Sequence, residues 1–271
     1  MQGQEANVRS AIVPEEECGI STSKLRARNS LFRIVGGSSV PILEMKNNVP
    51  IHGFPWMVRL SKTMAINSQY CGGTLISRKH VLTAAHCMIT CTAISRCKAI
   101  EACTQDELSC RDAGFGWATL GDYDRHTTNQ GELYRKIKGY IIHPKTIQAR
   151  PPDAAFLYDY AIAILNECVH FTHNVQPVCL PKSDGATYEG KTVTAIGWGS
   201  MKYMGKRSYT LQHINIKVFS DTECRKISSI YNSSNLMCAG DPINWKKDAC
   251  QGDSGGKQMV NVLCFYQHYK I

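Results

Sequence analysis

Short apolar runs separated by turn residues dominate the chain from Ile34 onward. The runs are rich in β-branched residues and are bounded by Gly, Pro and Asn, as strands are. No long amphipathic helical pattern lies between them. The runs occupy residues 56–60, 73–77, 80–83, 136–142, 160–165 and 192–196. Short strands at this spacing predict an all-β fold, either a sandwich or a barrel.

The first 33 residues follow a different pattern. They are polar, become basic towards Arg33 and keep no sustained hydrophobic period, so we expect an extended leader. They also lack the apolar core of a secretory signal peptide. No stretch of the chain approaches the ~18 apolar residues that span a bilayer, so we expect no membrane span.

Composition indicates a globular chain with one large domain or two small ones. Of its 271 residues, 43% are apolar and 20% are charged, which is ordinary for a protein that buries a core. The net charge of +9 comes from basic residues scattered along the chain, without a Lys/Arg run or interleaved aromatic residues. This pattern favours a solvated surface over a polyanion-binding one and predicts no nucleic-acid partner.

Thirteen cysteines are too many for a cytosolic enzyme that has no CxxC pair. Disulfide bonds explain them better, which predicts a secreted or extracellular protein. Because no signal peptide is visible, we expect either that the true start lies upstream of Met1 or that the gene model is incomplete. The segment 88–120 is especially rich in cysteine, and we interpret it as an inserted, disulfide-stapled loop. Its cysteines are Cys91, Cys97, Cys103 and Cys110. A zinc site is the alternative, but the segment has no CxxC pair and no His, so we expect no metal.

Near the C-terminus, the pentapeptide Gly-Asp-Ser-Gly-Gly at 252–256 places Ser254 between glycines. Acyl transfer by a serine needs a hydroxyl beside an imidazole, an acid that fixes the tautomer of that imidazole, and backbone donors for the oxyanion. The glycines let the backbone curl so that the N–H groups of Gly252 and Ser254 could point at one spot. Such pentapeptides also occur as plain turns, so this pentapeptide alone does not show whether Ser254 is catalytic.

Two further residues could complete such a site. His86 follows the run 80–83, and Asp159 stands at the head of the run 160–165, where it can be desolvated and accept a hydrogen bond from an imidazole. On its own, His86 would more simply be a satisfied core residue. The order His86, Asp159, Ser254 is what favours catalysis.

These residues, in this order, resemble the trypsin and chymotrypsin family of serine peptidases. The resemblance runs from about Cys18 to Gly256 and rests on several independent motifs. They are IVGG at 34–37, CGG at 71–73, AAHC at 84–87, PVCLP at 177–181, GWG at 197–199, MCAG at 237–240 and GDSGG at 252–256. The resemblance implies two antiparallel Greek-key β-barrels with the active site between them.

By that resemblance, Ser254 is the nucleophile, His86 the general base and then acid, and Asp159 the acid that orients the imidazole. Gly252 and Ser254 donate the oxyanion-hole N–H groups. Asp248, six residues before Ser254, lies at the floor of the specificity pocket, where a carboxylate selects Arg or Lys at the cleaved bond. A solvent-exposed turn is the alternative for Asp248. The implied function is a serine endopeptidase without a cofactor, whose partners are protein or peptide substrates and protease inhibitors.

The leader is then a propeptide, residues 1–33, in front of a peptidase domain over residues 34–271. Cleavage after Arg33 by an activating protease would free the Ile34 amine to pair with Asp253, the acid before the nucleophile. Without that partner a buried Asp253 charge is costly, so the uncleaved zymogen should not form its oxyanion loop.

The resemblance also implies three disulfides and leaves seven cysteines unassigned. The implied pairs are Cys71 with Cys87, Cys224 with Cys238, and Cys18 with Cys179, the last of which tethers the propeptide. The unassigned residues are Cys91, Cys97, Cys103, Cys110, Cys168, Cys250 and Cys264. The inserted loop either pairs internally or takes in Cys168, and the sequence does not choose. The segment 121–132 stands where some family members hold calcium, but a few carboxylates on a loop are more often just solvated.

After the serine box the chain departs from the family. Lys257 replaces the family's Pro, and residues 257–271 match none of the motifs that build the last strands of the second barrel and the walls of the specificity pocket. We therefore expect an incomplete second barrel with an open edge, and Cys250 without its usual partner unless Cys264 substitutes. A non-catalytic or truncated homologue that binds partners is the alternative to an active peptidase.

Overall fold

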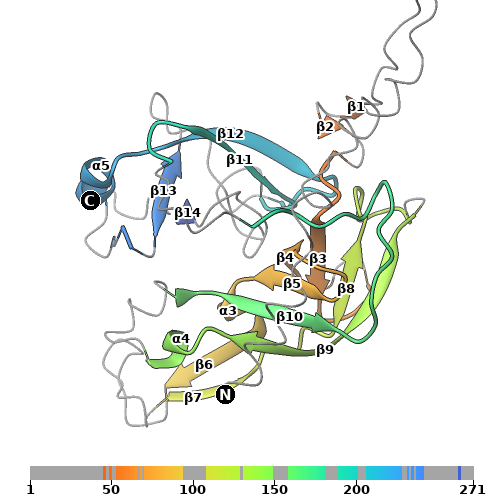
Figure 1. The fold of residues 1–271 in the computed structure, drawn as a ribbon. Helices are drawn as coiled ribbons and strands as arrows, with labels where there is room; N and C mark the ends of the chain where they lie inside the picture. Colours follow the sequence, from red (N-terminus) through yellow and green to blue (C-terminus); the bar gives the residue numbers. More distant parts are fainter. Residues whose placement is uncertain are drawn as a thin grey trace, which may run out of the picture.

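The computed structural model describes the chain in segments. These are residues 45–46, 49–50, 53–65, 68, 70–93, 108–128, 131–148, 158–180, 188–200, 206–227, 231, 233–234, 236–240 and 262–263. Within them the protein is mostly β-strand with a few short helices (Figure 1), which confirms the predicted all-β fold. No helix in the described segments is long and apolar enough to cross a membrane.

A closed barrel forms the first half of the molecule. Its strands are β3 (Met57–Ser61), β4 (Tyr70–Leu75), β5 (His80–Thr83), β8 (Trp117–Leu120), β9 (Leu133–Ile142) and β10 (Ala161–Leu165). They run around the barrel in the order β10-β5-β4-β3-β8-β9, and every neighbouring pair is antiparallel. Closure leaves no unpaired edge, so the barrel needs no partner to complete its hydrogen bonds.

Period-two burial explains why these runs become barrel strands. In β10, Ala161, Ala163 and Leu165 are buried and alternate with half-buried residues. Strand β3 is buried along its whole length, because Val58 and Leu60 belong to the core inside the barrel while Met57 packs on the other side.

The second half is a four-stranded sheet. Strands β11 (Thr192–Gly197), β12 (Gln212–Val218) and β13 (Met237–Gly240) pair antiparallel, and β14 (Val262–Leu263) joins β13 in parallel. Within the described residues this half is an open sheet, whereas the first half is a closed barrel. Strand β14 comes from the tail in which no family motif was recognised, and it covers one edge of β13.

Short elements complete the description. Helix α5 (Asp221–Ile227) follows β12 and starts with a capping box, in which the Ser220 N–H donates to Glu223 Oε2 at 2.8 Å and the Glu223 N–H donates to Ser220 Oγ at 3.2 Å. Helices α3 (Ala85–Met88) and α4 (Lys145–Gln148) are single turns. Strands β1 (Met45–Lys46) and β2 (Val49–Pro50) form a small sheet of their own.

The inserted segment forms a hairpin and returns to the barrel. Strands β6 (Ile89–Ala93) and β7 (Leu108–Asp112) pair only with each other, in a two-stranded sheet that leaves the barrel at α3 (Figure 1). Residues 117–120 of the segment interpreted as a loop form β8, a barrel strand.

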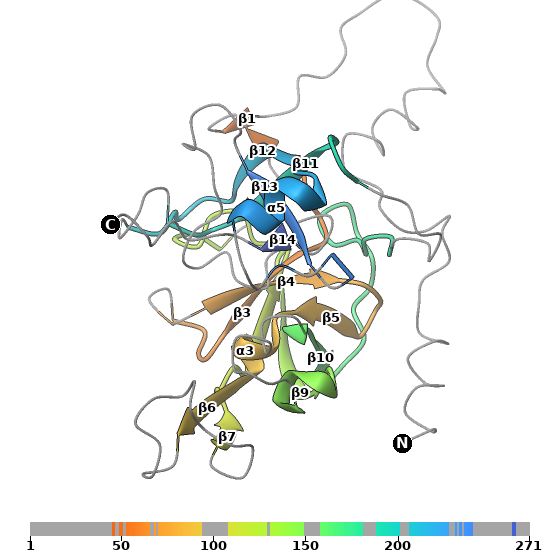
Figure 2. The same ribbon diagram turned by 90° about the vertical axis from the view of Figure 1, so that its left-hand side faces the viewer.

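The four-stranded sheet lies on one side of the barrel (Figure 2). The two halves pack on each other through a core that contains several aromatic residues. Trp198 follows β11 and is 1% exposed between Met57 and Tyr70 of the barrel and Leu211 of the second half. The Tyr70 hydroxyl donates to Trp198 O at 2.6 Å, and the Trp198 indole N–H donates to Tyr123 O at 3.3 Å. A site at the junction of the halves therefore rests on a packed interface.

Candidate active site

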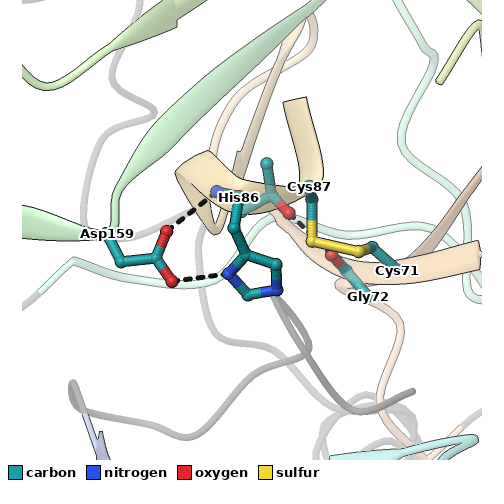
Figure 3. The surroundings of a disulfide bond; sticks show 6 residues. Cys71, Gly72, His86, Cys87 and Asp159 are labelled. Carbon is teal, nitrogen blue, oxygen red and sulfur yellow. Dashed lines mark hydrogen bonds and ion pairs between the residues drawn. A yellow bond between two sulfur atoms is a disulfide. The ribbon is translucent and has the colours of Figure 1, made fainter. Parts of the chain in front are cut away.

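His86 is the exposed member of a buried helical turn. In α3, Ala85, Cys87 and Met88 are all buried, whereas His86 is exposed. Cys87 is disulfide-bonded to Cys71 of β4, and the small side chains of the Ala-Ala pair let the turn lie directly on the barrel core. The turn is thus fixed on one side by packing and by a covalent bond, and it presents the imidazole on the other (Figure 3).

The imidazole of His86 is held by the carboxylate of Asp159 (Figure 3). His86 Nδ1 lies 2.7 Å from Asp159 Oδ2, and the His86 backbone N–H donates to Asp159 Oδ1 at 2.9 Å. An ionised carboxylate only accepts, so Nδ1 carries the proton in this contact and Nε2 is the acceptor in the neutral ring. This tautomer is the one that a general base needs if its proton arrives at Nε2.

Register explains how two residues so far apart in sequence come to meet. Strands β5 and β10 are neighbours, with Thr83 opposite Ala161. His86 comes three residues after Thr83, and Asp159 comes two residues before Ala161, so both leave the barrel at the same end of the same pair of strands.

Opposing influences set the pKa of His86. Desolvation in the partly enclosed turn lowers the pKa, while the hydrogen bond to Asp159 and the charge of that carboxylate raise it. The carboxylate prevails, and the pKa of His86 lies above its ordinary value. Its side chain is 50% exposed and that of Asp159 is 23% exposed, so the imidazole is open to a substrate.

Aromatic and backbone contacts that the sequence reading missed support Asp159. The Tyr158 ring stacks on the His143 ring, with centroids 5.0 Å apart and planes at 10°, and Lys145 Nζ lies 5.2 Å from the Tyr158 centroid. The His143 N–H donates to Tyr160 O at 3.0 Å, and the Tyr160 N–H donates to Tyr158 O at 2.7 Å. Both neighbours of Asp159 are therefore tied to the end of β9.

The remaining predicted site residues lie outside the described segments. They are Arg33, Ile34, Asp248, Gly252, Asp253 and Ser254. Their roles as activation residues, pocket acid, oxyanion donors and nucleophile stay predictions.

The cysteines fall into bonded and free sets. The structure contains the bonds Cys71–Cys87 and Cys224–Cys238, and Cys179 is also disulfide-bonded, while Cys18 lies outside the described segments. Cys168 is free and exposed, so in this structure it does not pair with the inserted loop.

Within the described segments, a single group brings three metal-binding side chains together, and it does not fit a metal. Its members are Cys71, His86 and Cys87. The two sulfur atoms are bonded to each other in the disulfide, so neither is available as a thiolate ligand.

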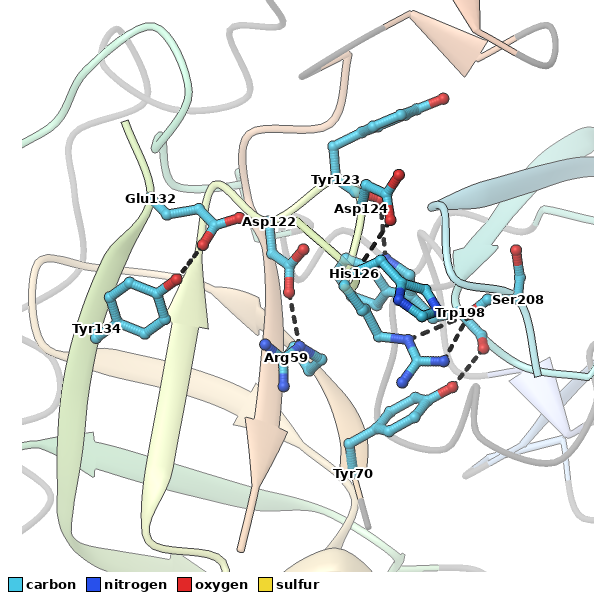
Figure 4. A network of polar contacts seen from close by, with 11 residues as sticks. Arg59, Tyr70, Asp122, Tyr123, Asp124, His126, Glu132, Tyr134, Trp198 and Ser208 are labelled. Carbon is cyan, nitrogen blue, oxygen red and sulfur yellow. Dashed lines mark hydrogen bonds and ion pairs between the residues drawn. The ribbon is translucent and has the colours of Figure 1, made fainter. Parts of the chain in front are cut away.

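In the segment 121–132, where some family members hold calcium, the carboxylate of Asp122 is already paired with an arginine (Figure 4). Asp122 is buried, and its Oδ2 lies 2.6 Å from Arg59 Nε of β3. Glu132 accepts a hydrogen bond from the Tyr134 hydroxyl. Burial raises the pKa of Asp122, and the Arg59 guanidinium offsets part of that shift. Asp122 Oδ1 is buried without a hydrogen-bond partner, but a calcium ion needs six to eight oxygen ligands and would meet the Arg59 charge here. These residues do not fit a calcium site.

A second arginine ties the same segment to the other half of the molecule. Arg125 is buried, its Nε and Nη2 donate to Ser208 O at 3.2 and 3.0 Å, and its guanidinium lies 4.4 Å from the centroid of Tyr70. Tyr70 in turn bonds to the backbone of Trp198 (Figure 4). This chain of contacts joins the two halves of the molecule.

Known proteins are similar to this chain in sequence and in fold. The family model described as Trypsin matches residues 45–262. The chain is 32% identical over 250 residues to ovochymase-2 of Mus musculus, which covers 90% of this chain and 35% of that protein. It is 30% identical over 256 residues to the proclotting enzyme of Tachypleus tridentatus, covering 91% of this chain and 58% of that protein.

Another relative and a solved structure agree with these. The CLIP domain-containing serine protease B9 of Anopheles gambiae is 30% identical over 270 residues, covering 93% of this chain and 57% of that protein. The chain thus spans between about a third and three fifths of the length of these relatives. A solved structure titled "Structure of GrC" superposes with a TM-score of 0.60 at 24% identity, covering 80% of this chain and 81% of the other, which supports the fold.

The match to the family model extends over most of the chain and includes the segments that carry His86 and Asp159. The chain therefore belongs to the trypsin family of serine peptidases.

Proposed function

We propose that this chain is a trypsin-like serine endopeptidase that hydrolyses peptide bonds after Arg or Lys. The observation that carries the proposal is the pair His86–Asp159, with Nδ1 and Oδ2 2.7 Å apart on a helical turn fixed by the Cys71–Cys87 bond. An imidazole oriented in this way, half exposed and with a raised pKa, is suited to take and return a proton.

The proposed mechanism assigns one step to each group. His86 Nε2 accepts the proton of the Ser254 hydroxyl while Ser254 Oγ attacks the scissile carbonyl, and Asp159 stabilises the imidazolium that forms. The N–H groups of Gly252 and Ser254 bind the oxyanion. His86 then returns the proton to the leaving amine, and a water molecule hydrolyses the acyl-enzyme by the same two transfers.

Specificity and activation are proposed from the family pattern. Asp248 would hold the cationic side chain of the residue before the cleaved bond, which favours Arg or Lys and also inhibitors that present one. Cleavage after Arg33 by an activating protease would free Ile34 to pair with Asp253. The disulfide bonds of the structure support a secreted protein, because such bonds persist in oxidising compartments.

Turnover of an arginine ester by the Arg33-cleaved chain tests this proposal. We expect the ester to be hydrolysed, Ser254→Ala and His86→Ala to lose the activity, and Asp248→Ser to lose it for Arg and Lys esters. His170→Ala is a matched control, because His170 is exposed on a loop after β10. Substantial turnover by Ser254→Ala equal to that of the unchanged chain would refute the assignment.

A non-catalytic homologue that binds protease partners or inhibitors is a second candidate. It is favoured by the departure from the family pattern at Lys257 and beyond. It predicts no turnover by the cleaved chain together with retained binding of a macromolecular inhibitor of trypsin-like enzymes.

A further inference from the structure

The hairpin formed by β6 and β7 directly follows α3, the helical turn that bears His86. Strand β6 begins at Ile89, immediately after Met88, the last residue of α3. At the foot of the hairpin the Ala113 N–H donates to Met88 O at 2.8 Å. Met88 is 1% exposed and belongs to the barrel core, against which Ala113 also packs, so the foot is fixed.

Beyond its foot, the hairpin gains no ladder hydrogen bonds from the other described strands. Its two strands pair with each other and with no other described strand. Arg111 and Asp112 of β7 are exposed. An isolated two-stranded hairpin is marginally stable in water, so this one needs a further source of stability.

The register of the hairpin places two cysteines directly opposite each other. Cys91 of β6 is the Cα partner of Cys110 of β7. Opposed residues in an antiparallel ladder alternate between hydrogen-bonded and non-hydrogen-bonded pairs. Met88 and Ala113 are hydrogen-bonded partners, and Cys91 with Cys110 lies three pairs further out, which makes it a non-hydrogen-bonded pair.

The backbone spacing of such a pair suits a disulfide. Opposed residues of a non-hydrogen-bonded pair have Cα atoms about 4.5 Å apart, and their side chains approach more closely than in the other kind of pair. Disulfides join Cα atoms roughly 4.4–6.8 Å apart. The general spacing of such a pair therefore falls within the range that a disulfide spans.

Five of the other described cysteines do not compete for these two. Cys71, Cys87, Cys224 and Cys238 are bonded to each other in pairs, and Cys168 is free and exposed. Cys97 and Cys103 lie in the connection between β6 and β7, outside the described segments.

We propose that Cys91 and Cys110 form a cross-strand disulfide that staples the hairpin next to the candidate active site. When the bond forms, the two cysteine thiols lose two protons and two electrons. An oxidising disulfide of the secretory compartment accepts them and is reduced to two thiols. The bond closes a loop through the connection 94–107 and so limits the disorder available to the unfolded hairpin. It keeps the segment that follows His86 in one register whether or not the chain is catalytically active.

Peptide mapping of the unreduced chain tests the bond without any assay of activity. Free thiols are first blocked, and the chain is then cut with cyanogen bromide at Met88, with trypsin at Arg96 and Arg111, and before Asp106 with Asp-N. This releases Cys91 in residues 89–96 and Cys110 in residues 106–111, each as the single cysteine of its peptide. We expect these two peptides joined, and separated by reduction. Recovery of either one blocked, or joined to a peptide carrying Cys97, Cys103, Cys168 or any other cysteine, would overturn the proposal.

A variant pair tests what the bond does. In Cys91→Ser/Cys110→Ser we expect hydrogen exchange to show loss of amide protection in 89–93 and 108–112, with the protection of β3 and β10 retained. The matched control is Cys97→Ser/Cys103→Ser, which should keep the protection of both strands. Equal protection of the hairpin in the two variants would overturn its role as a staple.

Discussion

Two carboxylates in this molecule each contact a nitrogen atom of a basic side chain at nearly the same distance, but in different surroundings. Asp159 Oδ2 lies 2.7 Å from His86 Nδ1, and Asp122 Oδ2 lies 2.6 Å from Arg59 Nε. The side chains of the first pair are 50% and 23% exposed, whereas those of the second are 8% and 1% exposed. The length of the contact therefore does not distinguish the proposed catalytic pair from the buried one.

The two carboxylates differ in the side chain that each one contacts and in their exposure to solvent. His86 can change its charge near neutral pH and faces outward, so Asp159 can stabilise a charge that appears and disappears. Arg59 instead is the hydrogen-bonded partner of the buried Asp122, and its removal would leave a buried carboxylate unpaired. We therefore expect changes at Asp159 to affect activity with little effect on stability, and changes at Arg59 to do the reverse.

The largest expected effect is that of Asp159→Asn on activity. The amide cannot hold the Nδ1–H tautomer, so kcat for an arginine ester should fall by about 10⁴-fold, the size that this exchange has in a well-studied member of the family. The free energy of unfolding in urea should change by less than about 1 kcal/mol, because exposed pairs contribute little. A loss of stability that matches the loss of activity would break the comparison.

The next effect is that of Arg59→Leu on stability. It leaves Asp122 buried and unpaired, which should cost about 3–5 kcal/mol in urea unfolding at pH 7. The double variant Arg59→Leu/Asp122→Leu is the control and should recover most of that loss, because neither charge of the pair is then left buried without the other. If the single and double variants unfold alike, the buried pair is not what stabilises this region.

Tyr158→Ala should have a smaller effect that separates positioning from stability. Loss of the stack on His143 frees the chain before Asp159, so kcat should fall by about tenfold with KM nearly unchanged. Tyr209→Ala is a matched control, since Tyr209 also contacts an imidazole, that of His126, and an arginine, Arg125, but is not linked to Asp159. Equal losses in the two variants would argue against a positioning role.

The pH dependence of His86 gives the finest test. Its pKa is raised in the folded chain, so protonated His86 stabilises the fold; that contribution is complete below the unfolded pKa and is lost as pH rises through the folded pKa. In Asp159→Asn the NMR titration of His86 should move to lower pH, because the carboxylate is what raises the pKa. The Arg59→Leu/Asp122→Leu variant should leave the titration in place, and a shift there would mean that the two pairs are coupled.

The local pattern of apolar and polar residues explains which strands could be predicted from the sequence. The apolar runs at 56–60, 73–77, 80–83, 136–142, 160–165 and 192–196 overlap strands β3, β4, β5, β9, β10 and β11. Strand β12 was not foreseen, because Gln, His, Asn and Lys take its more exposed positions and leave it without an apolar run. Strand β14 was not foreseen either, because it lies in the tail where no motif was recognised.

Of the two carboxylate pairs, one could be expected from the sequence and the other could not. His86 and Asp159 stand at the ends of recognisable strands, so their meeting could be expected from motif order. Arg59 and Asp122 are 63 positions apart, and only the barrel register of β3 against β8 brings them together. One signal was available, namely an arginine inside the apolar run 56–60, since a charge in a buried strand needs a partner.

Covalent labelling with a biotinylated fluorophosphonate tests whether His86 activates Ser254 as a nucleophile. This reagent phosphonylates a serine whose hydroxyl is activated by a neighbouring general base. In the chain cleaved after Arg33, we predict a single label on the peptide that contains Ser254, with labelling lost in His86→Ala and kept in His170→Ala. Absence of label in the correctly cleaved, folded chain, or a label that persists without His86, would contradict the account.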